Sequence, residues 1–221
     1  MIPLTAGSFP DFFQALHGCD PFPWQSRLAT QVLASGWPSV IAMPTGSGKT
    51  ACLDVAIFAL AAEVGMEQPR RQARRIFFVI DRRIVVDEAY SRAKRIAARL
   101  AEAKDGLLAQ VADRLRALAG PDEVPLATAI LRGGIYRDDR WSRSPSQPTV
   151  VVGTVDQVVA FVPAAQAEAA LQVLRAYPVS ATAVRIGTVT ESPAALVTLE
   201  SRIGTKRILD MHSGEQLPRI C

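Results

Sequence analysis

Short apolar runs and segments of helical periodicity alternate along the first part of the chain. Four runs, residues 39–42, 76–80, 126–131 and 149–152, are mostly apolar, and 76–80 is continuously so, as buried parallel strands are. Between and around them, apolar residues recur three and four positions apart. This spacing predicts helices over residues 11–16, 25–33, 51–62, 84–100 and 107–118. The succession predicts an α/β fold built on a parallel sheet.

The pattern changes beyond residue 158. Residues 163–176 form an alanine-rich helix pattern that lies between two prolines. Segments 184–186 and 197–199 alternate between apolar and polar residues and predict two strands, and residues 207–210 are a candidate third. The sequence therefore predicts a small α+β segment at this end of the chain.

Composition narrows the class of protein only slightly. The 221 residues are 49% hydrophobic, which is enough for a globular core, and the net charge of +4 suits a nucleic-acid partner without requiring one. The three cysteines are widely spaced and form neither a disulfide framework nor a zinc pattern. We find neither a signal peptide nor an apolar run long enough to cross a membrane, and we expect a reducing, cytoplasmic setting.

A glycine-rich loop lies between the first apolar run and the helix pattern 51–62. It reads Met43-Pro44-Thr45-Gly46-Ser47-Gly48-Lys49-Thr50, a Walker A motif with methionine at its first position. Glycines let the backbone N–H groups point at phosphate oxygens, and the following helix presents its positive end to the same anion. Lys49 would reach the β- and γ-phosphates and the Thr50 hydroxyl would hold Mg²⁺. The motif predicts ATP and Mg²⁺ bound by Thr45, Gly46, Ser47, Gly48, Lys49 and Thr50.

Gln25 lies upstream of this loop, where nucleotide-dependent helicases use a glutamine to recognise adenine. An amide suits that task because it donates and accepts hydrogen bonds at once. We therefore add Gln25 to the predicted nucleotide site. The alternative is an exposed glutamine at the start of a helix.

Residues 84–90 imitate a Walker B motif, with three apolar residues before Asp87 and Glu88. Two observations favour a helix instead. The apolar residues continue at helical spacing to Leu100, and a strand here would follow strand 76–80 without the crossover that a parallel pair requires. We expect Asp87 and Glu88 in the first turn of a helix, where acids suit the helix dipole.

From about residue 22 to residue 157 the sequence resembles the first RecA-like domain of the CRISPR-associated helicase–nuclease of type I systems, a superfamily 2 helicase. The matching motifs are Phe22-Pro23-Trp24-Gln25, the 43–50 loop, Val79-Ile80-Asp81-Arg82-Arg83, Leu131-Arg132-Gly133-Gly134, Trp141 and Gly153-Thr154-Val155-Asp156-Gln157. The resemblance implies, for residues 1–157, an incomplete RecA-like sheet with helices on both faces. It also implies single-stranded DNA and the CRISPR surveillance complex as partners, with Arg82, Arg83, Gly153 and Thr154 in loops that touch the DNA backbone.

The same resemblance shows which parts of the family pattern this sequence lacks. The family places an Asp-Glu-x-His motif after Gly-Thr-Val-Asp-Gln, and none follows Gln157 here. The second RecA-like domain with its arginine finger and the nuclease domain are not in the sequence either. We therefore expect nucleotide binding without hydrolysis or unwinding, because the charges that stabilise phosphoryl transfer are missing.

Residues 160–221 resemble the C-terminus of the hydrogenase maturation protein HypE. The specific part is the ending Pro218-Arg219-Ile220-Cys221, preceded by Asp210-Met211 and Ser213-Gly214-Glu215. In that family the terminal cysteine thiol accepts a carbamoyl group that is then dehydrated to supply cyanide. The resemblance implies that Cys221 is a carbamoyl acceptor and that hydrogenase maturation proteins are partners. The sequence thus predicts two parts, 1–157 and 158–221.

Three functions follow from these observations. The first is a fragment of a DNA helicase that binds ATP without turning it over, fused to a HypE-like tail. The second is a carbamoyl carrier that acts through Cys221. The third is a small ATPase in which Asp87 and Glu88 act as Walker B.

Overall fold

The chain folds as two compact units, Met1–Val158 and Val159–Cys221, which we describe separately. The structure is a computed structural model. It describes residues 3–66, 70–80, 82–119, 124–131, 144, 146–154, 164–176, 181–185, 187–188, 190, 198–200, 204 and 206–208.

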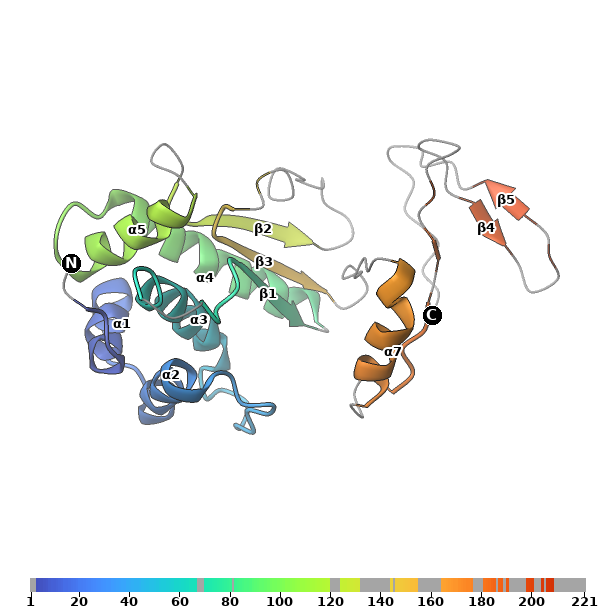
Figure 1. The fold of residues 1–221 in the computed structure, drawn as a ribbon. Coiled ribbons are helices and arrows are strands. Elements are labelled where there is room, and N and C mark those ends of the chain that lie inside the picture. Colours follow the sequence, from blue (N-terminus) through green and yellow to red (C-terminus); the bar gives the residue numbers. More distant parts are fainter. Residues whose placement is uncertain are drawn as a thin grey trace. The chain divides into compact units, whose positions relative to one another are not determined.

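The first unit is a layer of helices packed on a small sheet (Figure 1). Its elements are η1 (Ala6–Ser8), α1 (Phe9–His17), α2 (Pro23–Ser35), η2 (Lys49–Ala51), α3 (Cys52–Ala62), β1 (Arg75–Ile80), α4 (Arg83–Glu102), α5 (Gly106–Ala119), β2 (Ala127–Leu131) and β3 (Thr149–Thr154). All five helices expected from periodicity in this part of the chain are confirmed.

The sheet is parallel, with strand order β1-β3-β2. Three of the predicted strands form it, and β3, the last in sequence, lies in the middle. Every residue of β3 is buried, as expected for a strand that pairs on both edges and is covered by side chains. An α/β fold with a parallel sheet flanked by helices is thus confirmed, in agreement with an incomplete RecA-like fold.

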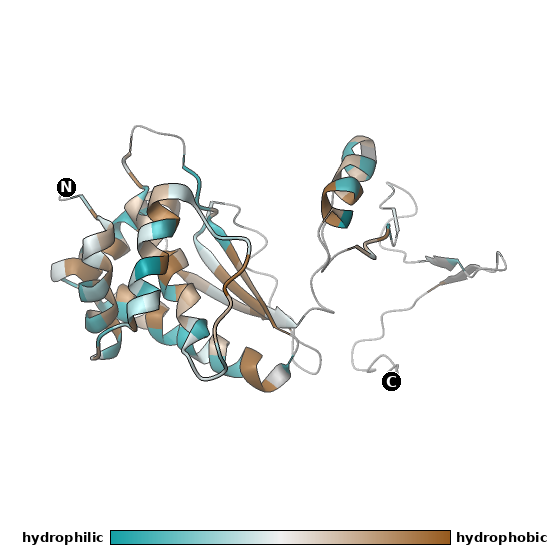
Figure 2. Ribbon diagram, turned by 90° about the horizontal axis from the view of Figure 1, so that it is seen from below, coloured by the Kyte–Doolittle hydropathy of each residue, from teal (hydrophilic) through white to brown (hydrophobic). Residues whose placement is uncertain are grey.

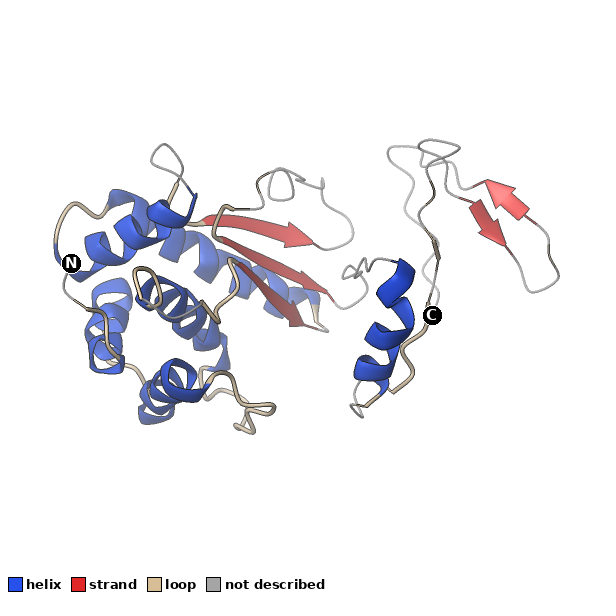
Figure 3. Cartoon of the chain, viewed as in Figure 1, coloured by secondary structure: helices blue, strands red, loops and turns tan. Residues whose placement is uncertain are grey.

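The fourth predicted strand does not form. Residues 39–42 run as irregular backbone into the glycine-rich loop, and Figure 3 shows loop after the end of α2. Val40 is 74% exposed, whereas Ile41 packs against the core. A short apolar run supplies the side chains for a strand, but a strand also needs a neighbouring backbone with which to pair.

The helical layer covers one face of the sheet. Ile76, Phe78 and Val152 join the main core, which also holds the apolar residues of the helices. Within that layer α3 is buried from Leu53 to Ala62. An aromatic cluster fixes α1 against α3, with the Phe9 and Phe58 rings 5.6 Å apart, edge to face.

The opposite face of the sheet is less well covered. Phe77 and Val79 of β1 are 46% and 42% exposed, and beside them Ala129, Leu131 and Val151 form a separate small cluster. By the register of the strands, Phe77, Val151 and Ala129 are Cα neighbours on this face. The sheet therefore has one fully packed face and one that is partly open.

A charged cluster joins three helices inside the helical layer. The Asp54 carboxylate of α3 is fully buried and accepts from Arg92 Nε of α4 at 2.7 Å. Its other oxygen lies 2.6 Å from Nε2 of His17 on α1. Arg92 also lies over the Phe13 ring, 5.5 Å from its centroid. A buried carboxylate requires such partners, because an unpaired charge in this place would be strongly unfavourable.

The second unit has fewer described elements. They are η4 (Ala164–Gln166), α7 (Ala167–Arg175), β4 (Thr198–Glu200) and β5 (Lys206–Ile208). The predicted helix is confirmed, and Figure 2 shows both hydrophobic and hydrophilic residues on α7. The strands predicted over 197–199 and 207–210 correspond to β4 and β5, which pair as an antiparallel hairpin. The strand predicted over 184–186 does not form at residues 184–185, which are irregular, and Ile186 lies outside the described residues. The hairpin connection contains Gly204, whose φ of 79° favours glycine.

None of the described helices in either unit is long and apolar enough to cross a membrane.

Candidate functional site

The glycine-rich loop turns sharply at two glycines. Gly46 and Gly48 have left-handed φ angles of 80° and 74°, which other residues rarely adopt. Between them, the Ser47 hydroxyl donates to the Pro44 carbonyl at 2.7 Å. The Ala51 N–H then donates to the Gly48 carbonyl at 3.0 Å, so the loop leads directly into η2 and α3. The loop therefore ends at a helix N-terminus, where backbone N–H groups are available to an anion.

Lys49 folds back over this loop. Its ammonium nitrogen donates to the carbonyl oxygens of Met43 and Pro44, both at 2.8 Å. The side chain is exposed, so these contacts can be exchanged for contacts to a ligand. The positive charge is thus held at the loop rather than extended into solvent. The arrangement suits a phosphate chain, which needs a cation beside backbone N–H groups.

The first turn of α2 is hydrogen-bonded to the loop. Trp24 Nε1 donates to the Ser47 carbonyl at 2.9 Å, and Gln25 Nε2 donates to the Gly48 carbonyl at 3.1 Å. The Gln25 carbonyl oxygen in turn accepts from the Phe22 N–H at 2.9 Å. Gln25 is only 2% exposed. The amide nitrogen and the amide oxygen of Gln25 are thus both bonded within the protein, and they tie α2 to the glycine-rich loop.

An open pocket of about 380 Å³ adjoins the loop. It is lined by Phe22, Pro23, Trp24, Arg27, Met43 and Ser47. The Phe22 side chain is 55% exposed, and its ring lies against the loop: a Cβ added to Gly48 would meet Phe22 Cε2 at 3.3 Å. An exposed aromatic ring beside a phosphate loop offers a stacking surface for a flat ring system.

Thr50 follows Lys49 at the start of η2 and is half-buried. Within the described part of the chain, no group of three or more His, Cys, Asp or Glu side chains could hold a metal ion. A Mg²⁺ ion at this loop would therefore take its oxygen ligands from a bound phosphate chain, from water and from the Thr50 hydroxyl.

The residues expected to touch DNA gather at the carboxyl edge of the sheet. Arg82 is exposed, follows β1 and caps α4, while Gly153 and Thr154 end the neighbouring strand β3. The register pairs Ile80 with Thr154. Arg83 begins α4, but its side chain is not described.

Gly153 and Thr154 are both closely packed at the end of β3. A Cβ on Gly153 would lie 3.0 Å from the Leu131 carbonyl oxygen, so close packing against β2 explains the glycine. Thr154 is 4% exposed, and its hydroxyl has no hydrogen-bond partner among the residues that the structure describes.

Residues 84–90, which resemble a Walker B motif in sequence, lie on a helix. Residues 84–86, Asp87 and Glu88 all belong to α4, as periodicity predicts, and Glu88 is exposed. A Walker B carboxylate pair requires the end of a strand beside the phosphate loop. The hypothesis of an ATPase built on Asp87 and Glu88 therefore lacks its structural requirement in this chain.

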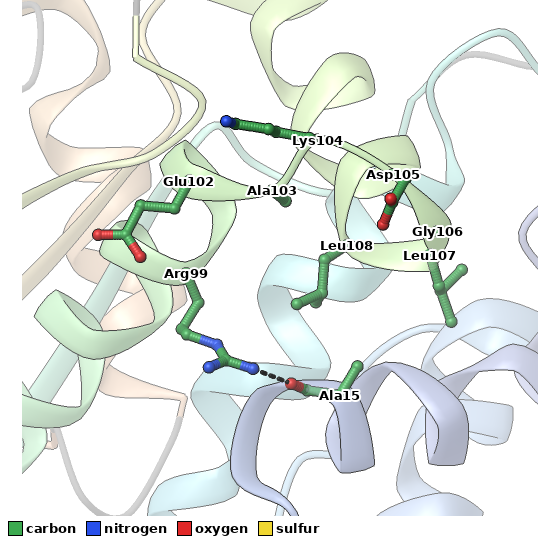
Figure 4. A pocket seen from close by; sticks show the side chains of 9 residues that line it. All are labelled: Ala15, Arg99, Glu102, Ala103, Lys104, Asp105, Gly106, Leu107 and Leu108. Carbon is green, nitrogen blue, oxygen red and sulfur yellow. Dashed lines mark hydrogen bonds between the residues drawn. The ribbon is translucent and has the colours of Figure 1, made fainter.

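A larger open pocket, of about 660 Å³, lies where α4, α5 and α1 meet (Figure 4). Arg99 and Lys104 line it together with Glu102 and Asp105, and the Arg99 guanidinium donates to the Ala15 carbonyl at 2.8 Å. The mixed charges favour no single class of ligand. None of the residues predicted from the sequence to be functional lines this pocket.

Cys52 begins α3, directly after the loop. Burial, and secondarily the negative charge of Asp54, raise the pKa of its thiol above the ordinary value of 9.0. This thiol is therefore a poor nucleophile at neutral pH. The thiol expected to react, Cys221, lies outside the described residues.

Sequence reasoning missed the role of Trp24. Its position directly before Gln25 and its indole N–H, a lone donor on an otherwise apolar ring, were the available signals. Neither reveals that the Ser47 carbonyl lies within reach, because that contact depends on how α2 approaches the loop.

Two comparisons with known proteins match the chain. The model of the family described as type III restriction enzyme, res subunit (ResIII) matches residues 19–161. Curated carbamoyl dehydratases HypE are similar over a shorter stretch. The protein of Azotobacter vinelandii is 41% identical over 70 residues, and that of Rhodobacter capsulatus is 46% identical over 65 residues.

These alignments with HypE cover 32% and 29% of this chain, but only 20% and 19% of the two relatives. The hydrogenase expression/formation protein HupE of Azotobacter chroococcum mcd 1 is similar to the same extent, with 40% identity over 70 residues, 32% of this chain and 20% of that protein. The chain thus spans about a fifth of the length of the curated relatives it matches.

Proposed function

The chain belongs to the family of the type III restriction enzyme res subunit, and on this premise we propose that its glycine-rich loop binds ATP together with Mg²⁺. The domain is of the helicase, RecA-like type, a class that uses ATP and Mg²⁺ generally. The observation that carries the proposal is the position of Lys49, whose ammonium group is held at the loop by two carbonyl oxygens. In the complex, Lys49 exchanges these carbonyls for phosphate oxygens, and Thr45 to Gly48 supply backbone N–H groups.

Calorimetric titration of the chain with ATP and Mg²⁺ tests this proposal. Lys49→Ala removes charge-assisted hydrogen bonds, and we expect affinity to fall by about tenfold or more. Lys104→Ala is the matched control, because Lys104 is also exposed but lies at the other pocket. Equal binding by the wild-type chain and Lys49→Ala would count against the proposal.

We further propose that this chain holds ATP without hydrolysing it at an appreciable rate. The support is the helical setting of Asp87 and Glu88, because a Walker B carboxylate pair lies at the end of a strand. Without a carboxylate to orient water and Mg²⁺, the electrostatic stabilisation of phosphoryl transfer is small.

The finer proposal is descent from a CRISPR-associated DNA helicase, with single-stranded DNA and the CRISPR surveillance complex as partners. It is supported by the motif set described above and by the position of Arg82, Gly153 and Thr154 at one sheet edge. Fluorescence anisotropy with a labelled single-stranded oligonucleotide tests the DNA contact. Arg82→Ala should weaken binding and reduce its salt dependence, whereas Arg95→Ala, exposed on the body of α4, should not. Equal loss in both variants would point to nonspecific charge attraction.

The similarity to carbamoyl dehydratase HypE supports a second candidate function, a carbamoyl carrier of the reducing cytoplasm. In this reaction the Cys221 sulfur attacks an activated carbamoyl carbon, a C–S bond forms, and the oxygen leaving group departs with the thiol proton. Carbamoyl phosphate, ATP and a carbamoyltransferase would supply the activated group. Mass spectrometry after incubation with these components should show one carbamoyl group on Cys221. An unmodified thiol would exclude this function for the chain.

A further inference from the structure

The hydrogen bonds of Gln25 bear on which base the proposed nucleotide site accepts. Its amide nitrogen donates to the Gly48 carbonyl, its amide oxygen accepts from the Phe22 N–H, and the residue is 2% exposed. A Cβ on Gly48 would approach Gln25 Nε2 to 2.9 Å, so the amide is packed against the loop as well as bonded to it. To meet a base, Gln25 would have to break both bonds. The Phe22 N–H would then lose its acceptor, while the Gly48 carbonyl would keep only its bond from the Ala51 N–H.

The two bonds from α2 have a common effect on the loop. Trp24 holds the Ser47 carbonyl and Gln25 holds the Gly48 carbonyl, so two consecutive carbonyls point toward α2. In a planar trans peptide the C=O and the following N–H point in opposite directions. The N–H groups of Gly48 and Lys49 therefore point away from α2. Two consecutive N–H groups fixed on one side are the start of an anion-binding concavity.

The pocket beside the loop offers little with which to select a base. Phe22, Pro23, Trp24 and Met43 contribute mainly apolar surface, and the Ser47 hydroxyl is already bonded to the Pro44 carbonyl. The charged side chain that lines it, Arg27, is exposed and can only donate. The N7 acceptor that a guanidinium would meet is present in both adenine and guanine.

We propose that Trp24 and Gln25 are positioning residues that shape the phosphate loop, and that the site consequently accepts purine nucleoside triphosphates without choosing between adenine and guanine. The proposal rests on the proposed function, because it concerns the same loop. Affinity comes from the phosphate chain at the loop and from stacking on Phe22, and the base edge is not recognised by Gln25.

Calorimetric titrations with ATP, GTP and tripolyphosphate, each with Mg²⁺, test the proposal on the intact chain. For the wild type we expect the dissociation constants of ATP and GTP to agree within about threefold, because a discriminating pair of hydrogen bonds would separate them further. Gln25→Ala should weaken all three ligands by a similar factor, about fivefold for one lost hydrogen bond. The loss must include tripolyphosphate, which has no base.

Two further variants separate positioning from folding. Trp24→Phe keeps the ring and removes the donor to Ser47, and it should weaken tripolyphosphate and ATP alike. Trp37→Phe is the matched control, because the Trp37 indole donates to the Gln72 side chain at 3.0 Å, away from the loop. It should leave all three affinities unchanged. Should Gln25→Ala fail to fold, the proposal is still tested by Trp24→Phe and by the ratio of the wild-type dissociation constants for ATP and GTP.

The opposite results are distinct. A wild-type preference for ATP over GTP of tenfold or more, lost in Gln25→Ala while tripolyphosphate binding is retained, would overturn the inference and make Gln25 the base-reading residue. Binding of none of the three ligands by the wild type would overturn the proposed function itself, and the inference with it.

Discussion

Arg92 and Asp54 form a buried ion pair, with Nε of the arginine 2.7 Å from Oδ2 of a carboxylate that is fully shielded from solvent. The pair joins α4 to α3, the helix that follows the phosphate loop. His17 of α1 completes the cluster at 2.6 Å from the other carboxylate oxygen. Arg92 Nη2 also lies 3.0 Å from the same His17 nitrogen, which can serve only one of these neighbours as a hydrogen-bond partner in a given tautomer.

Removing one member of this pair should destabilise the fold strongly. Arg92→Ala leaves a buried carboxylate without its cation, and we expect the free energy of unfolding to fall by about 3–5 kcal/mol. Urea denaturation measures the change. Asp113→Ala is the control, because its partner Arg116 lies at 3.0 Å on the surface and Asp113 is 70% exposed. That variant should cost less than about 1 kcal/mol, and equal losses in both variants would contradict the argument.

Gly48 should tolerate a side chain less well than Gly46. Both have left-handed backbones, so alanine at either position introduces strain of order 1–3 kcal/mol. Only at Gly48 would the new Cβ also approach Gln25 Nε2, to 2.9 Å, whereas at Gly46 it meets open space. Gly48→Ala should therefore lower both the melting temperature and nucleotide affinity more than Gly46→Ala. A larger loss in Gly46→Ala than in Gly48→Ala would show that the contact between Gln25 and Gly48 does not constrain the loop.

The reactivity of Cys52 should depend on pH in a defined direction. Its pKa is raised, chiefly by burial and then by Asp54, so the thiolate is scarce below the ordinary value of 9.0. Alkylation followed by peptide mapping should label the exposed Cys19 first and Cys52 only as the pH rises above that value. Because a raised folded-state pKa stabilises the fold at low pH, this contribution is lost as the pH rises through it. Rapid labelling of Cys52 at neutral pH would refute the prediction.

Glu88→Gln should change neither ATP affinity nor any residual ATPase rate, because Glu88 is an exposed residue on α4. A steady-state phosphate-release assay with and without single-stranded DNA makes the measurement, with Lys49→Ala as the variant expected to lose binding. Turnover that both substitutions abolish would restore the Walker B assignment and refute the proposal that the chain holds ATP without hydrolysis.

The helices of this fold could be predicted because the three- and four-residue spacing of apolar residues is a local property of the sequence. The helical periodicity from Val85 to Leu100 identified α4 despite its resemblance to a catalytic motif. The strand predicted from the apolar run 39–42 does not form, because a strand needs a pairing partner that is distant in sequence. Val40 is instead exposed to solvent. The alternating residues 184–185 were predicted as strand but are irregular, and the hairpin instead pairs residues 198–200 with 206–208.

The glycine-rich loop could be recognised in the sequence, but its contacts could not. The motif identified the loop and Lys49, because glycine and lysine at fixed spacing carry their own geometry. The bonds from Trp24 and Gln25 to the loop carbonyls arise from the packing of α2, which no short pattern encodes. The hydrogen bonds of Gln25 to Phe22 and Gly48 are therefore a feature that only the tertiary structure reveals.

The strand order β1-β3-β2 constrains how the chain can fold while it is being synthesised. β1 and β2 each pair with β3 and not with one another, yet β3 is made last. On the ribosome, the two outer strands therefore wait without partners until residues 149–154 have emerged from the exit tunnel. The helices can form during this interval, since their hydrogen bonds are local, but the sheet closes only when its central strand is inserted between the two already made.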